Sequence, residues 1–113
     1  MASGQLHEKK EELSTKVVDA HRAYLSLIEE IEAVDWYSQR ADVTEDEELK
    51  RILVHNKNEE IEHACMMMEW LRRNQPGWSD KMHTYLFTQR EIVQVEQNED
   101  ESENDLNIGQ NKK

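Results

Sequence analysis

The fold is decided by residues 44–73, which read TEDEELKRILVHNKNEEIEHACMMMEWLRR. Alternating steps of three and four residues along this stretch pick out one face, here called the seam, which consists of Leu53, Asn56, Glu60, His63, Met67 and Trp70. Such spacing is typical of an α-helix that packs against partner helices. No stretch alternates with a period of two, and three glycines and one proline leave few places to turn. The sequence therefore predicts an all-α protein.

The expected architecture is a two-helix antiparallel hairpin plus a short C-terminal helix. The first helix is expected over residues 7–39, followed by a polar turn over 40–44. Thr44 is the expected N-cap of the second helix, with Glu47 as its capping-box partner. That helix continues to Arg73, because Asn74-Gln75-Pro76-Gly77 stops it. A shorter helical segment is expected over 79–95, with a break at 88–90.

Composition changes at residue 96. Residues 96–105 are acidic and contain no apolar side chain, so this stretch cannot bury enough surface to order itself. The chain then ends with Leu106-Asn107-Ile108-Gly109 and a polar tail. We therefore divide the sequence into a helical hairpin domain, 1–95, and a disordered acidic linker with a terminal peptide, 96–113.

The overall composition restricts the partners of the chain. Only 36% of the 113 residues are hydrophobic and the net charge is −11, so self-association is expected to complete the core and nucleic acid is excluded as a partner. No apolar run approaches the ~20 residues of a membrane span, and the first ten residues lack the apolar core of a signal peptide. The lone cysteine, Cys65, suits a reducing cytoplasm and is expected to be a buried or half-buried thiol.

Charged side chains interrupt the apolar face of each long helix. Glu60 and His63 lie in the middle of the seam, one turn apart. On the first helix, Glu30 lies inside the apolar arc, whereas Glu29 and Glu32 point away from it. A buried carboxylate beside a buried imidazole is costly unless polar neighbours or a metal ion pair with them. The alternative, a polar seam that sets helix register, needs no metal.

These residues match the ligands of a di-iron site. Ferritin-like di-iron centres take a Glu from each of two helices and a Glu-x-x-His motif from each of two others. One chain here supplies Glu30 and the Glu60–His63 motif, which is half of that set. Two chains related by a two-fold axis supply all of it, and they form a four-helix bundle. Such ligands suit iron or manganese, and the expected reaction is oxidation of Fe²⁺ by O₂.

Two further groups on the first helix belong to the prediction. Tyr37 lies one to two turns beyond Glu30 on the same face. Its hydroxyl is placed to hydrogen-bond a ligand; alternatively, its ring packs as an ordinary core aromatic. On the opposite face, Glu29, Glu32 and Trp36 are three and four residues apart. The carboxylate pair offers a weak, hydrated cation site, an approach point for Fe²⁺, or is an ordinary solvated surface. Trp36 is expected to be exposed.

Four stretches resemble the encapsulated ferritins: IEEIEAVDWY (28–37), HNKNEEIEHA (55–64), EWLRR (69–73) and TYLFT (84–88). The resemblance implies a ferroxidase centre formed across a dimer, with dimers assembled into a ring-shaped decamer. It implies iron ligands at Glu30, Glu60 and His63, with Tyr37 beside them. It also implies a site through which metal approaches, here called the access site, at Glu29, Glu32 and Trp36.

The same resemblance implies an encapsulin shell as partner. Members of the family are cargo of such shells, which store the oxidised iron, so the expected location is cytoplasmic, within an encapsulin nanocompartment. The end of this chain is similar to the shell-targeting peptide Leu-Gly-Ile-Gly but has Leu106-Asn107-Ile108-Gly109. Two alternatives stay open from the residues alone: a peroxide-consuming di-metal protein, and a non-catalytic helical scaffold or adaptor.

Overall fold

The computed structural model describes residues 5–100, and every regular element in that part of the chain is helical. A 3-10 helix, η2 (Lys10–Glu12), precedes α1 (Thr15–Val43), α2 (Glu47–Asn74) and α3 (Trp78–Tyr85), and residues 92–100 are also α-helical. The predicted all-α class is confirmed. None of the described helices is both long and apolar enough to cross a membrane.

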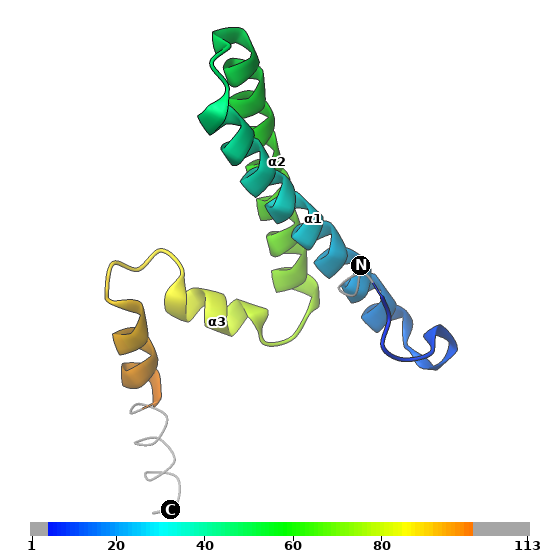
Figure 1. Ribbon diagram of the computed structural model, residues 1–113. Coiled ribbons are helices and arrows are strands. Elements are labelled where there is room, and N and C mark those ends of the chain that lie inside the picture. The colour runs from blue at the N-terminus through cyan, green and yellow to red at the C-terminus, as the bar shows by residue number, and fades with distance from the viewer. Residues whose placement is uncertain (1–4, 101–113) are drawn as a thin grey trace, which may run out of the picture. The chain divides into compact units, whose positions relative to one another are not determined.

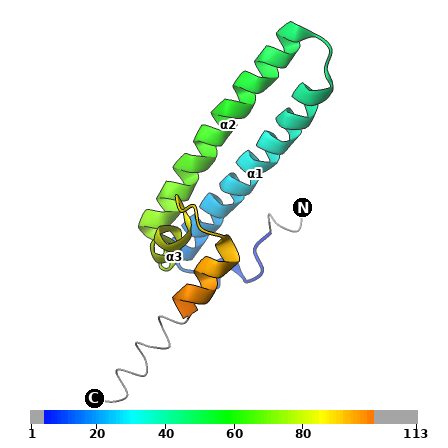
Figure 2. The same ribbon diagram turned by 90° about the vertical axis from the view of Figure 1, so that its left-hand side faces the viewer.

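The helices α1 and α2 form the antiparallel hairpin (Figure 1). The view turned by 90° in Figure 2 shows them side by side along most of their length. Their close packing relies on small side chains, since the buried residues of the two helices are Ala20, Ala23, Ala41, Ala64 and Leu71. The hairpin prediction is therefore confirmed.

The start of α1 differs from the prediction by eight residues. The helix begins at Thr15 because the Ser14 hydroxyl accepts a hydrogen bond from the Val17 N–H and caps it. Residues 7–12 are good helix formers by composition, but all of them are exposed, so no packing extends the helix toward the N-terminus.

The prediction that Thr44 caps α2 was wrong. Helix α1 runs to Val43, so Thr44 is its C-cap and donates its backbone N–H to the Arg40 carbonyl. The N-cap of α2 is Asp46, whose carboxylate accepts from the Leu49 N–H at 2.8 Å. The connection between the helices is consequently only residues 44–46, which is shorter than expected.

Much of the hairpin's apolar surface is not covered by the chain itself. Large hydrophobic side chains on both helices are exposed, among them Val17 (50%), Ile31 (49%), Ile61 (42%) and Met66 (63%). Exposed apolar surface of this extent is typical of a chain that associates with another protein surface.

The chain divides into two units after Pro76. In the second, Gly77 has a left-handed φ of 92° and precedes α3, and a break over residues 86–91 separates α3 from helix 92–100. The Glu91 carboxylate caps that last helix by accepting from the Val93 and Gln94 N–H groups. Residues 96–100 continue it, although the sequence analysis assigns them to the linker. Residues 101–113, with the terminal peptide, lie outside the described part.

Candidate metal centre

Glu30, Glu60 and His63 converge between the two hairpin helices. Glu30 comes from α1, and the other two come from α2 one turn apart. The His63 Nδ1 lies 3.6 Å from Glu30 Oε2 and 3.5 Å from Glu60 Oε2. Each residue offers a ligand atom, and all of these atoms lie within 4.8 Å of one another. Within residues 5–100, no other group of three acidic, histidine or cysteine side chains converges in this way.

The Glu30 carboxylate is the least satisfied group of the cluster. Its Oε2 atom is buried and has no hydrogen-bond partner, because 3.6 Å to His63 Nδ1 is too long for a hydrogen bond. Leaving a buried acceptor unpaired costs on the order of 1–3 kcal/mol. A cation held among the three side chains removes that cost, so the residues present fit a bound metal ion.

The cluster is open on one side. The side chains of Glu30 and Glu60 are 26% and 24% exposed, and that of His63 is 46% exposed. The three residues offer one ligand atom each, so a metal ion held by them would keep coordination positions open to further ligands. Carboxylate and imidazole donors suit iron or manganese.

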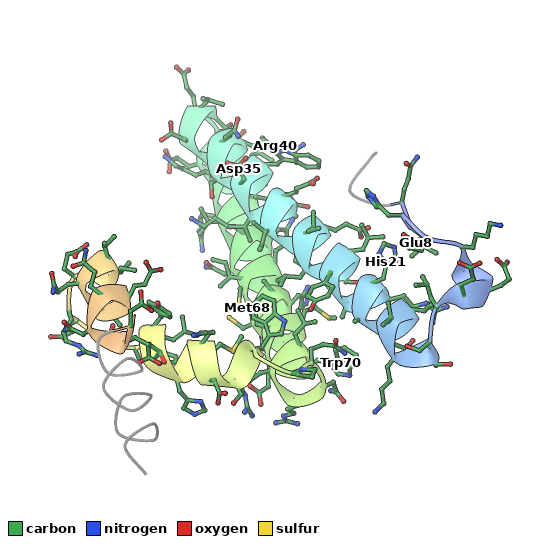
Figure 3. All side chains as sticks on the ribbon, turned by 90° about the horizontal axis from the view of Figure 1, so that it is seen from below. Glu8, His21, Asp35, Arg40, Met68 and Trp70 are labelled. Atoms are coloured by element: carbon green, nitrogen blue, oxygen red, sulfur yellow. The ribbon has the colours of Figure 1, made fainter. Side chains whose placement is uncertain are left out.

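Tyr37 lies two turns from Glu30 on α1, but no hydrogen bond joins its hydroxyl to the cluster within the described chain. The guanidinium of Arg40 instead lies 5.6 Å from the centre of the Tyr37 ring. Arg40, labelled in Figure 3, is one turn further along the helix. This cation–π contact was not predicted from the sequence, although a spacing of three residues on a helix indicates it.

The predicted access site lies on the surface of α1, away from the cluster. Glu29 is exposed, Glu32 is half-buried and Trp36 is 51% exposed, as expected of it. The two carboxylates belong to no converging ligand group in the described residues. Any role for them in metal uptake therefore stays a prediction.

The exposure of one residue of α2 differs from its prediction, and one charge cluster on this helix was not predicted. Cys65 is exposed, not buried or half-buried as expected, because it lies on the helix face turned away from α1. Glu69 accepts hydrogen bonds from Arg72 and Arg73, each at 2.7 Å. These hydrogen bonds lower the pKa of the Glu69 carboxyl from 4.5 to about 2. In the sequence, Glu69 stands three and four residues before Arg72 and Arg73, a spacing that indicates ion pairs on a helix.

The sequence of this chain is similar to those of known ferritin-like proteins. The sequence model of the EncFtn-like family matches residues 5–89. A ferritin-like protein of Thermotoga maritima is 54% identical over 93 residues, which are 82% of this chain and 82% of that protein. An encapsulated ferritin-like protein of Rhodospirillum rubrum is 50% identical over 95 residues, 84% of this chain and 68% of the relative.

A crystal structure of a Nitrosomonas europaea protein has the same fold. The two superpose with a TM-score of 0.75 at 49% sequence identity, covering 77% of this chain and 96% of the other.

Proposed function

The chain belongs to the EncFtn-like family, and we propose that it is a ferroxidase, an enzyme that oxidises Fe²⁺ to Fe³⁺ with O₂. The observation that carries this proposal is the buried, unpaired Oε2 of Glu30, which faces His63 of α2. A buried oxygen without a hydrogen-bond partner needs an explanation, and binding of an ion is one that fits here. Iron is the substrate, and Glu30, Glu60 and His63 are the residues that bind it.

The complete site requires two chains. One chain offers two carboxylates and one imidazole, and an isologous dimer doubles both numbers. Four carboxylates and two imidazoles are the ligand set of ferritin-like four-helix bundles. The four negative charges balance those of two Fe²⁺ ions. The partial exposure of the cluster and the uncovered apolar residues of the hairpin support association with a second chain. By resemblance, dimers assemble further into a decameric ring.

The reaction follows from the charge of the site. Two Fe²⁺ ions give up one electron each, and O₂ takes up both electrons with two protons to leave as hydrogen peroxide. The carboxylates of Glu30 and Glu60 hold the two ions close together and stabilise the additional positive charge of Fe³⁺. The His63 imidazole is a neutral donor, so it occupies a coordination position without over-neutralising the metal.

The remaining predicted residues act around this centre. In the proposal, Tyr37 stands beside it, oriented by Arg40. Glu29, Glu32 and Trp36 form the access site, where a carboxylate pair attracts hydrated Fe²⁺ before it reaches the centre.

We further propose that the oxidised iron is delivered to an encapsulin shell in the cytoplasm. The support is that the Rhodospirillum rubrum relative is an encapsulated ferritin-like protein and that Leu106-Asn107-Ile108-Gly109 resembles a shell-targeting peptide.

The test is anaerobic loading with Fe²⁺, followed by admission of air and measurement of ferric absorbance and of dissolved oxygen. Glu30→Gln and His63→Ala should lose rapid oxidation, because each removes a ligand. Glu62→Gln, an exposed carboxylate on the same turn of α2 as His63, is the matched control and should oxidise at the wild-type rate.

Three other outcomes would contradict the proposal or replace it. Equal rates in wild type, Glu30→Gln and His63→Ala would overturn the site. Slow oxidation in all of these proteins would favour a non-catalytic scaffold. Rapid consumption of added peroxide, but not of O₂, would favour the peroxide-consuming alternative.

A further inference from the structure

Three consecutive methionines follow the metal ligands on α2, at positions 66, 67 and 68. They are neighbours in the chain but have different surroundings, because successive side chains of an α-helix point about 100° apart. Met66 is 63% exposed, whereas Met67 and Met68 are half-buried. Of the three, Met67 belongs to the seam, the face that also carries Glu60 and His63. The proposed iron centre gives none of these methionines a role.

Helix geometry places Met67 beside the cluster. It lies one turn beyond His63 and two turns beyond Glu60, which is about 6 Å and about 10 Å further along the helix axis. Around the axis, it points within about 10° of the direction midway between those two ligands, whereas Met66 and Met68 point about 90° and about 110° away from that direction. Long side chains of a helix lean toward its N-terminus. The side chain of Met67 therefore covers the turn that carries His63.

The chemistry of a thioether makes this placement significant. The sulfur of methionine is readily oxidised to the sulfoxide, and the proposed reaction forms one hydrogen peroxide for every two Fe²⁺. Free peroxide oxidises thioethers slowly, whereas iron activates its O–O bond, so the peroxide is most reactive while it is still beside the ions. A side chain that is held next to the site is then oxidised in preference to one that meets the peroxide only after release, because held reactants have a high effective concentration.

From this placement we infer that Met67 is the side chain oxidised during iron oxidation, by peroxide that reacts before it leaves the centre. The inference rests on the proposed function, which supplies the peroxide. One oxygen atom of the peroxide forms a bond with the sulfur of Met67, the O–O bond breaks, and the other oxygen leaves with both protons as water. The sulfur loses two electrons and the peroxide takes them up, so no iron is consumed.

Oxidation of Met67 protects the metal ligands. The imidazole of His63 is also open to oxidation, and oxygen added to its ring would damage a ligand without repair, whereas methionine sulfoxide reductases restore the thioether. Two other easily oxidised side chains of α2 are less well placed. Cys65 is exposed and points about 170° away from the direction of the ligands, and Trp70 lies two turns beyond His63. Met67 is therefore a renewable sacrificial residue of the centre.

Mass spectrometry of the full chain after turnover locates the added oxygen. Anaerobic protein receives Fe²⁺ in small additions, each followed by air, and is then digested. Trypsin cuts after Lys57 and Arg72, so the three methionines and His63 lie in one peptide, which fragmentation reads residue by residue. We expect one oxygen atom on Met67, in a yield at least about tenfold above that on either neighbouring methionine. The yield should rise with the number of additions.

Catalase in the same buffer tests whether the peroxide reacts before release. Catalase destroys peroxide in solution, so the yield of oxidised Met67 should not change. Loss of the product in the presence of catalase would overturn the inference, because it would make released peroxide the oxidant. Oxygen on Met66, Met68 or Trp70 in place of Met67 would overturn the assigned residue.

Hydrogen peroxide added to the metal-free protein should give a different order. In that experiment exposure governs the reaction, so Met66, which is 63% exposed, should be oxidised before the half-buried Met67. Preferential oxidation of Met67 in both experiments would overturn the inference, because it would show that the residue is reactive without the iron centre.

Met67→Leu and Met68→Leu form a matched pair for the protective role. Both remove a thioether from a half-buried position of the same helix and nearly conserve the side-chain volume. Met67→Leu should increase the oxygen found on His63 during turnover, and Met68→Leu should leave it at the wild-type level. Equal oxidation of His63 in the two variants would overturn the protective role.

Ferric absorbance recorded on the same samples separates this inference from the proposed function. Rapid iron oxidation with unmodified Met67 would overturn the inference and leave the ferroxidase proposal intact. Absence of rapid iron oxidation would overturn the ferroxidase proposal and, with it, the source of the peroxide. Glu30→Gln, which removes a ligand from the centre, should lose rapid iron oxidation and the oxygen on Met67 together.

Discussion

Replacing Glu30 by leucine should stabilise the metal-free protein and abolish its stabilisation by metal. The Oε2 atom of Glu30 is buried and unpaired, which costs about 1–3 kcal/mol. Leucine has a similar volume and no group to leave unpaired. The change also removes the contact with His63 at 3.6 Å, a half-exposed pair that contributes about 0–1 kcal/mol. The expected net gain therefore lies between about 0 and about 3 kcal/mol, centred on about 1–2 kcal/mol.

Thermal unfolding in a chelator, at one fixed chain concentration, measures this gain. For a domain of this size each kcal/mol raises Tm by roughly 4–8 °C. Anaerobic Fe²⁺ at a hundred times its Kd should then stabilise the wild type by about 2.7 kcal/mol and so raise its Tm, and it should leave the Tm of Glu30→Leu unchanged. Glu62→Leu, which is exposed on α2, is the matched control and should shift little in the chelator and respond to Fe²⁺ as the wild type does.

Two results would refute the reasoning. A loss of more than about 1 kcal/mol in Glu30→Leu under chelation would mean that the carboxylate is satisfied in the metal-free protein, contrary to the cost assigned to it. An Fe²⁺-induced shift equal to that of the wild type would mean that Glu30 binds no metal.

Three other predictions concern the helix ends, the charge cluster of α2 and the tail. Asp46→Ala should lower the free energy of unfolding in urea by about 1 kcal/mol and Thr44→Ala by less than about half of that, because Asp46 is the N-cap; equal losses would contradict this. The pKa of Glu69 is lowered to about 2 by Arg72 and Arg73, so its stabilising effect is complete above its ordinary pKa of 4.5 and is lost as the pH falls through about 2. Glu69→Gln should therefore melt below the wild type at neutral pH, and the two should converge near pH 2; a constant difference would argue against the ion pairs. Removing residues 105–113 should prevent co-purification with an encapsulin shell while iron oxidation continues, and retained co-purification would clear the tail of that role.

Local sequence determined the class of fold and the faces of the helices. An α-helix repeats every 3.6 residues, so Glu60 and His63 had to share a face of α2, and Glu30 had to lie on the apolar side of α1. The stop after Asn74 was equally local, since Pro76 cannot continue a helix and Gly77 takes a left-handed φ. The N-cap of α2 was not settled in this way, because Thr44 and Asp46 are both good capping residues.

Only the tertiary structure decided which residues of α1 meet which residues of α2. Helical periodicity assigns a face but not the sliding of one helix along another, which depends on how side chains interlock. Here the buried alanines Ala20, Ala23, Ala41 and Ala64 and the short connection after Val43 set that position. With it, Glu30 lies 3.6 Å from His63 and keeps an unpaired buried oxygen. The ligand types were readable in the sequence, whereas their convergence is a product of packing.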